Sequence, residues 1–137
     1  MSPAPYYFYR FNDSRTTELF DPELEIIGEL RTKYGLRSVD PAGYGYEYVR
    51  NGRVLTLVWR EREISIGGRH LPPEQWAVEF LYDVLVRTET LLMCPDGPGW
   101  WCTATESQIP KAPTDNEVEL IENLGHLMDW FGVHPHA

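Results

Sequence analysis

The sequence predicts one α+β domain, built from a mainly antiparallel sheet of about five to six strands with three helices largely on one face. Three observations lead to this fold class. Stretches with alternating apolar residues, typical of strands, are interspersed with stretches whose apolar residues recur at helical spacing. An Asn-Gly pair joins two alternating stretches, which is the strongest local signal for a β-hairpin. No internal repeat or long linker is present, so we expect a single globular domain over residues 1–137, with residues 133–137 as a frayed tail.

The first predicted elements are an aromatic strand and a helix. Residues 5–11, PYYFYRF, have strand propensity, and their aromatic side chains fall on both faces. Residues 20–35 predict a helix, because Asp21 can cap its start, Pro22 fits its first turn and Gly35 can end it. The residues that would form its buried stripe are Leu24, Ile27, Leu30 and Tyr34.

The Asn51-Gly52 pair fixes the register of a hairpin over residues 44–60, because its two-residue turn places Val49 opposite Val54. The other predicted pairs are Arg50–Arg53, Tyr48–Leu55, Tyr46–Leu57 and Tyr44–Trp59. One face of this hairpin would carry Tyr44, Tyr46, Tyr48, Leu55, Leu57 and Trp59. We expect that face to be buried, because a sheet commonly buries one face. The alternative is a ligand-binding platform, because tyrosine combines contact area with a polar tip. Its residues would be Tyr44, Tyr46, Tyr48 and Trp59.

A strand, a helix and a second hairpin follow. Residues 60–68 predict a charged turn and a third strand with Ile64 and Ile66 on one face. Residues 69–88 predict a helix that opens at two prolines, with an apolar stripe on one side. The second hairpin has strands near 89–94 and 100–105 around a loop of prolines and glycines.

The last predicted element is a helix over residues 114–132, TDNEVELIENLGHLMDWFG. Thr114 and Glu117 match a capping box at its start. The residues of its apolar stripe are Val118, Ile121, Leu124, Met128 and Phe131.

The net charge of −9 arises in the C-terminal half. Residues 1–36 carry 4 basic and 6 acidic side chains, residues 37–71 carry 6 and 4, and residues 72–137 carry 2 and 11. Such a field repels phosphate backbones and anionic lipid, and it speeds encounter with a basic protein. Because the chain has no stripe of basic and aromatic residues, direct nucleic-acid binding is disfavoured. The charge is also consistent with solubility alone.

The sequence indicates a cytoplasmic protein without a membrane partner. No apolar stretch approaches the ~18 residues that span a bilayer. The start, MSPAPYYFYRF, lacks the basic and leucine-rich regions of a secretory signal. Two cysteines do not make a disulfide scaffold, so we expect both thiols to be reduced.

No motif in the chain names a reaction, and we expect a protein that is not an enzyme. Cys94, Cys102 and Ser65 lack the neighbouring base that activates a nucleophile. The two cysteines would sit diagonally across the second hairpin rather than opposite each other. His70, beside two glycines, is the most plausible catalytic histidine, although its setting is more typical of a turn at a helix entrance.

The remaining histidines predict neither a catalytic site nor a metal site. His126 is followed by Asp129 at helical spacing, which could orient its ring but more simply indicates a solvated pair. His134 and His136 supply only two ligands at the end of the chain, whereas zinc needs three or four. We expect no metal and no cofactor.

Trp100 and Trp101 follow a loop of two prolines and two glycines. Adjacent side chains of a strand point to opposite faces, so one of the two rings would lie outside the core. With Asp96, Glu89 and Glu106 nearby, that ring could be the hot spot of a protein interface. In the alternative, Trp100 caps the core under the loop and Trp101 packs under the last helix, or a bulge turns both rings inward.

This combination of an acidic helix, TDNEVELIENLGHLMDWFG, a PDGPGWWC loop and an α+β chain without a catalytic motif resembles a class of bacterial proteins. These are the small acidic immunity proteins that neutralise polymorphic toxins. The resemblance covers the general build of the chain and no diagnostic motif. It implies a cytosolic protein that binds one basic cognate toxin or effector domain and covers its active site.

Three functions are therefore carried forward. The first is an immunity-protein-like inhibitor that uses the acidic half and an exposed tryptophan. The second is a small-molecule-binding protein or enzyme with an aromatic pocket at the tyrosine row. The third is an adaptor whose aromatic residues meet a second copy, so the chain could be a monomer or a small homo-oligomer.

Overall fold

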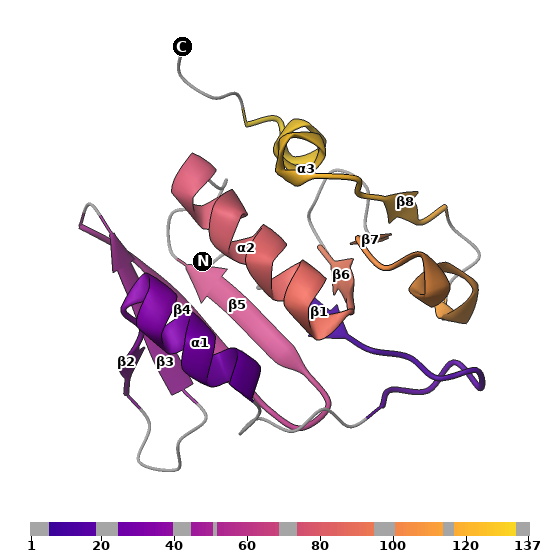
Figure 1. Ribbon diagram of the computed structural model, residues 1–137, viewed down its shortest axis with the longest axis horizontal. Coiled ribbons are helices and arrows are strands. Elements are labelled where there is room, and N and C mark those ends of the chain that lie inside the picture. The colour runs from indigo at the N-terminus through magenta and orange to yellow at the C-terminus, as the bar shows by residue number, and fades with distance from the viewer. Residues whose placement is uncertain are drawn as a thin grey trace.

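The computed structural model describes residues 6–18, 25–39, 45–50, 52–68, 74–94, 101–113 and 117–133. They form an α+β fold with one eight-stranded sheet and four helices, one of them a 3-10 helix (Figure 1). The strands are β1 (Tyr6–Tyr9), β2 (Arg37–Ser38), β3 (Gly45–Arg50), β4 (Arg53–Trp59), β5 (Ile64–Gly68), β6 (Leu91–Met93), β7 (Trp101–Thr103) and β8 (Glu119–Leu120). The helices are α1 (Glu25–Tyr34), α2 (Gln75–Thr88), η1 (Glu106–Lys111) and α3 (Leu124–Phe131).

The sheet has the strand order β2-β3-β4-β5-β1-β6-β7-β8. The first strand of the chain therefore lies in the middle of the sheet, where Tyr7 pairs with Ser65 of β5 on one side and with Met93 of β6 on the other. All neighbouring strands are antiparallel except β7 and β8, which are parallel. The sequence predicted five to six strands, and the two it missed are the edge strands β2 and β8. Each has only two residues, too few for a period of two to be recognised.

The β3–β4 hairpin has the predicted register. Val49 pairs with Val54 and Tyr48 with Leu55, and the pairing continues to Tyr46 opposite Leu57. Gly52 has φ +76°, the left-handed conformation that this type of turn needs. Asn51 and Tyr44 lie outside the described residues.

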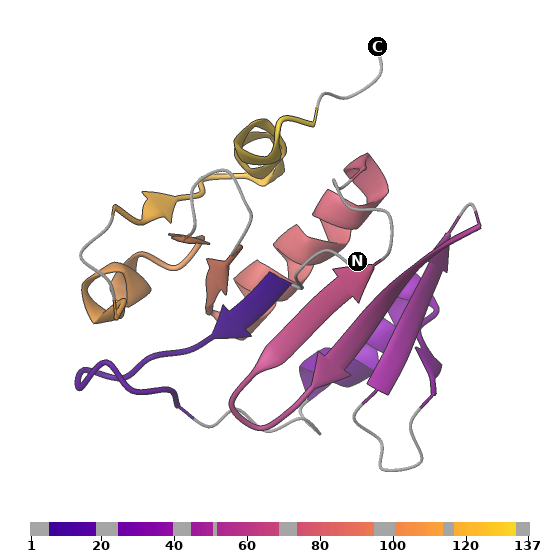
Figure 2. The same cartoon turned by 180° about the vertical axis from the view of Figure 1, so that it is seen from behind.

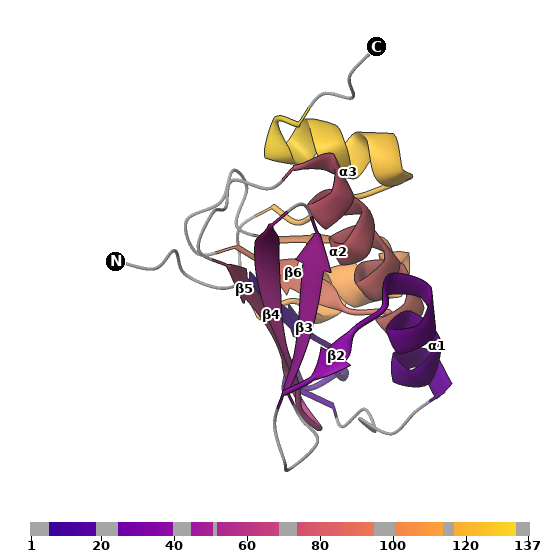
Figure 3. The same ribbon diagram turned by 90° about the vertical axis from the view of Figure 1, so that its left-hand side faces the viewer.

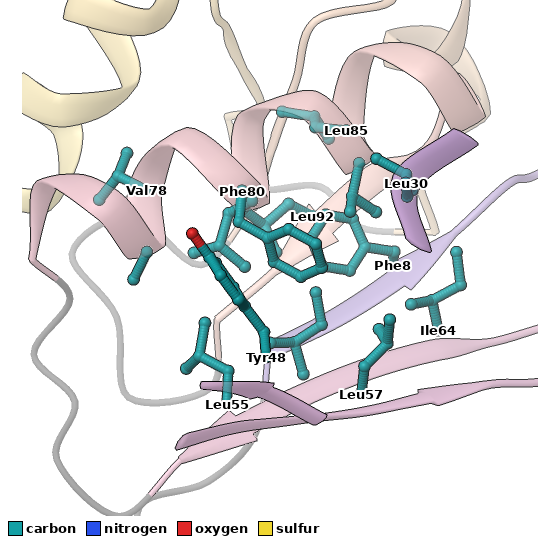
Figure 4. Packing of buried hydrophobic residues seen from close by; sticks show 14 of the residues in the cluster. Phe8, Leu30, Tyr48, Leu55, Leu57, Ile64, Val78, Phe80, Leu85 and Leu92 are labelled. Carbon is teal, nitrogen blue, oxygen red and sulfur yellow. The ribbon is translucent and has the colours of Figure 1, made fainter. Parts of the chain in front are cut away.

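Helices α1 and α2 lie on the same side of the sheet (Figure 3), and Figure 2 views the sheet from the opposite side. Between helices and sheet lies the main core (Figure 4), where Leu30 and Phe80 point toward Phe8, Leu57 and Ile64. All five of these side chains are fully buried. Burying a large apolar side chain contributes about 1.5–3 kcal/mol, so this layer is the main source of stability.

The two predicted N-terminal helices are confirmed with shorter bounds. The described part of the first begins at Glu25 and ends before Gly35, which has the positive φ of +64° expected of a helix-ending glycine. The second runs from Gln75 to Thr88, and its last carbonyl, Thr88 O, accepts from Arg10 Nε at 3.2 Å and Nη2 at 2.6 Å. The expected caps at Asp21, Pro22, Pro72 and Pro73 lie outside the described residues.

The prediction of one long C-terminal helix is wrong. Residues 117–122 are not helical, and β8 lies within them as the parallel neighbour of β7. The helix begins only at Leu124, after Asn123, whose side-chain oxygen accepts a hydrogen bond from the His126 backbone N–H at 2.8 Å. Glu117 therefore does not cap a helix, and its proposed partner Thr114 lies outside the described residues.

Candidate interaction surface

The sheet face opposite the helices carries a row of aromatic side chains, here called the aromatic row: Tyr7, Tyr9, Phe11 and Trp101. Tyr7 and Tyr9 stack with ring centroids 6.1 Å apart, and the Tyr9 and Phe11 rings are 5.9 Å apart. The Tyr9 hydroxyl donates to Glu63 Oε1 at 2.7 Å. Burial, together with this hydrogen bond, raises the pKa of Tyr9, so its ring offers a neutral phenol.

Trp101 lies on this face, opposite α1 and α2. It pairs with Met93, which in turn pairs with Tyr7, and its ring meets Phe11 edge-on at 6.2 Å. The ring is half-buried and packs with Val118 in a small cluster separate from the main core. Trp101 is therefore not under the last helix, as one alternative had it, because α3 contributes to the main core instead.

The sequence also predicted Trp100, Asp96, Glu89 and Glu106 for this surface. Trp100 and Asp96 lie outside the described residues. Glu89 and Glu106 are both exposed and lie near the end of the β6–β7 pair where Thr103 Oγ1 donates to Thr90 O at 2.8 Å. Trp101 is at the other end of that pair, about 7 Å away along the strand. A shared interface of Trp101, Glu89 and Glu106 therefore stays a prediction.

A buried glutamine that sequence reasoning missed positions the aromatic row. Gln108 of η1 accepts from the Phe11 backbone N–H through Oε1 at 2.9 Å and donates from Nε2 to Phe11 O at 3.2 Å. The amide thus takes the place of a neighbouring strand for Phe11, beyond the end of β1. No sequence pattern around Gln108 indicates that its side chain bonds to the backbone of Phe11.

Five exposed carboxylates in the C-terminal part of the chain are here called the acidic end: Glu106, Glu117, Glu119, Glu122 and Asp129. All are exposed, and none lies within ion-pair distance of a lysine or arginine among the described residues. The neighbouring Lys111 faces Asp13 instead, at 3.6 Å. Val118, which packs against the same small cluster as Trp101, lies between Glu117 and Glu119 in the chain. Because Glu119 pairs with Cys102, its side chain and that of Trp101 lie on opposite faces of the sheet.

His126 faces the acidic end, and not through Asp129 as the spacing had suggested. Its Nδ1 accepts from the Glu122 backbone N–H at 3.1 Å, so Nδ1 is the unprotonated nitrogen. Its Nε2 lies 3.8 Å from Glu119 Oε2. The histidine thus anchors the chain between β8 and α3 by a backbone contact that helical periodicity does not reveal.

Elsewhere, basic side chains are engaged by carboxylates of the same chain. Lys33 pairs with Asp83 at 2.6 Å, and Arg37 pairs with Glu47 at 2.7 Å. Arg53 pairs with Glu74 at 2.6 Å, and Arg87 pairs with Glu29. These four ion pairs hold part of the positive charge within the first two-thirds of the chain. Exposed carboxylates outside ion-pair distance of a described lysine or arginine also occur there, as at Glu25, Glu61 and Glu89.

The tyrosine row of the β3–β4 hairpin is part of the core. Tyr46, Tyr48 and Trp59 are buried, and the Tyr48 ring meets Trp76 and Phe80 of α2 at 5.3 and 5.1 Å. These rings are filled in by helix side chains, so they do not form the binding platform considered as the alternative.

The two cysteines are free and buried. Cys102 pairs with Leu92, which leaves Cys94 diagonally across the hairpin, as predicted. Burial raises the pKa of both thiols, which disfavours the reactive thiolate. Within the described residues no three His, Cys, Asp or Glu side chains are grouped so as to hold a metal ion.

In the part of the chain that the structure describes, no helix is long and apolar enough to span a bilayer. Comparison of the chain with protein-family models, with curated proteins and with solved structures finds no match.

Proposed function

We propose that this protein is an immunity-protein-like inhibitor, which binds a basic cognate toxin or effector enzyme in the cytoplasm and covers its active site. The partner is a protein, and binding needs no cofactor, metal or nucleic acid. The chain acts as a binding protein rather than as a catalyst.

One observation carries this proposal: the carboxylates of the acidic end are exposed and uncompensated, whereas most ion pairs of the molecule lie elsewhere. A concentrated, unpaired charge steers a partner of opposite sign and contributes to selectivity. The half-buried Trp101, which packs against the same small cluster as Val118, adds an apolar contact of the kind that anchors protein interfaces. Trp101 and Glu119 of β8 belong to neighbouring strands at one edge of the sheet, on its two faces.

The test has two steps. The tagged protein is used to capture partners from an extract of its native host, at about 50 mM and about 500 mM salt. The captured protein is then assayed for its own activity while the inhibitor is titrated. We expect a basic protein, retained near one to one at low salt and more weakly at high salt, whose activity is lost at equimolar inhibitor.

A matched pair of double variants tests the surface. Glu117→Lys/Glu122→Lys reverses two charges of the acidic end, and Glu25→Lys/Glu61→Lys makes the same change in net charge elsewhere at exposed positions. Glu122 and Glu25 both lie near the start of a helix, so the effects on stability are comparable. We expect at least tenfold weaker binding for the first variant and less than twofold for the second. Equal effects, or a captured protein whose activity survives saturation, would contradict the proposal.

A further inference from the structure

We infer that the outer edge of β8 holds an extended, lysine- or arginine-bearing segment of the partner as an added strand of the sheet. This inference rests on the proposed function and specifies how the partner is held.

The backbone of β8 makes hydrogen bonds to a neighbouring strand, β7, on one of its two sides. The Ile121 N–H donates to Thr103 O of β7 at 2.7 Å, and Leu120 pairs with Thr103 in the ladder. Alternate residues of a strand direct their N–H and C=O groups to opposite sides, so those of Leu120 point away from β7. β8 is the last strand in the order, and among the described residues no strand faces this side. The edge therefore presents an unpaired donor and acceptor to an incoming chain.

The side chains along this edge define what an added strand would meet. Glu117 and Glu119 are exposed, and they alternate with the half-buried Val118 and Leu120. Because side chains of neighbouring strands share faces, the added strand would place alternate residues beside the carboxylates and the others beside the apolar pair. Alternating basic and apolar residues fit this arrangement.

Charge decides between the possible occupants. A second copy pairing through β8 would set glutamates against glutamates, and like charges across a strand pair are destabilising. A basic segment turns the same contacts into attraction, so the edge disfavours self-pairing and favours a basic strand. The opposite edge of the sheet lacks this property, because Arg37 of β2 is already paired with Glu47 of β3.

The probe is an octapeptide of alternating lysine and valine, titrated into the isotope-labelled protein and followed by its amide NMR signals. Its controls are the same peptide with alternate backbone amides methylated and a peptide of alternating glutamate and valine. The matched protein variants are Leu120→Pro, which removes the outward N–H, and Leu120→Ala, which keeps it but also loses the leucine side chain. Proline is tolerated at a sheet edge because the lost N–H makes no ladder bond.

We expect saturable shifts of the amides of residues 118–121, and binding to Leu120→Pro about tenfold weaker than to Leu120→Ala, because proline removes one intermolecular backbone hydrogen bond and crowds the edge. The methylated and the glutamate peptides should bind at least tenfold more weakly than the probe. Equal binding of the methylated peptide, or shifts confined to α3 or the aromatic row, would overturn the inference. Because the peptide controls use the unaltered protein, the outcome stands even if Leu120→Pro fails to fold. The native partner could fail to bind Glu117→Lys/Glu122→Lys and yet bind Leu120→Pro and Leu120→Ala equally. That result would refute pairing at the β8 edge and leave the proposed function intact.

Discussion

Replacing Gln108 with leucine should lower the free energy of unfolding by about 2–4 kcal/mol. The side chain is 4% exposed and makes two hydrogen bonds to the backbone of Phe11, at 2.9 and 3.2 Å. Leucine has a similar size but can neither accept from the Phe11 N–H nor donate to its carbonyl. Each buried backbone group left without a partner costs about 1–3 kcal/mol, and the better burial of leucine offsets part of the sum.

Denaturant unfolding followed by tryptophan fluorescence measures this loss, read as a lower midpoint at an unchanged slope. The control is Gln75→Leu, because the Gln75 amide only meets Glu79 on an exposed helix face, at 3.3 Å. We expect that variant to stay within about 0.5 kcal/mol of wild type. A loss below about 1 kcal/mol for Gln108→Leu would mean that another group or water satisfies Phe11, and that Gln108 does not hold the aromatic row.

Three further predictions concern stability. Gly28→Ala should raise the free energy of unfolding by up to about 1 kcal/mol, because a Cβ there meets nothing within 4 Å. Gly125→Ala should raise it less, because its Cβ would lie 3.3 Å from Asn123 Oδ1. Thermal melts of the two variants compare these effects. Asn123→Ala should lower the free energy of unfolding by about 1 kcal/mol, because it removes the N-cap of α3. An unchanged melting temperature in the same experiment would show that this cap does not stabilise the fold. Burial raises the pKa of Cys94 and Cys102, so the folded state keeps protons that the unfolded chain loses above the ordinary thiol value of 9.0. The free energy of unfolding should therefore fall as pH rises above 9.0, and it should fall less steeply in Cys94→Ala/Cys102→Ala. Urea titrations from pH 7 to pH 10 measure both proteins. An equal pH dependence of the free energy of unfolding in the two would contradict the prediction.

The fold was predicted best where the sequence signals are local. The turn at Gly52 leaves only one register for β3 and β4, so the pairing of Val49 with Val54 followed from the sequence alone. The buried stripe of α1 likewise follows from spacing, and Ile27 and Leu30 are both in the core.

The C-terminal segment shows where local signals fail. Val118 and Ile121 fit a helical stripe that continues into α3, but residues 117–122 are not helical, and β8 within them pairs with β7. Because that pairing is parallel, no tight turn joins the two strands, and the sequence shows no hairpin signal. The strand is stabilised by contacts with residues far away in the chain, which local patterns do not reveal.

The candidate surface was predictable only in part. The excess of carboxylates was visible in the sequence, and so was the chance that Trp101 lies off the main core. Which charges are cancelled was not visible, because Arg87 and Glu29 meet only after α1 and α2 come together. The position of Trp101 likewise depends on Phe11, ninety residues earlier in the chain.

The central position of β1 has a consequence for how the chain is made. A ribosome releases residues 6–9 dozens of residues before their neighbours in the sheet, β5 and β6. Before β5 emerges, β3 and β4 can form a local hairpin, while the four aromatic residues of PYYFYRF that belong to β1 have no partner strand. After β5 emerges, the other side of β1 stays unpaired until β6 follows. Chains stalled before Leu91 leaves the ribosome should therefore engage chaperones through residues 6–9, and site-specific crosslinking at Phe8 would detect it. The side of the sheet that covers β1 with β6, β7 and β8 is therefore completed only after the C-terminal strands are synthesised.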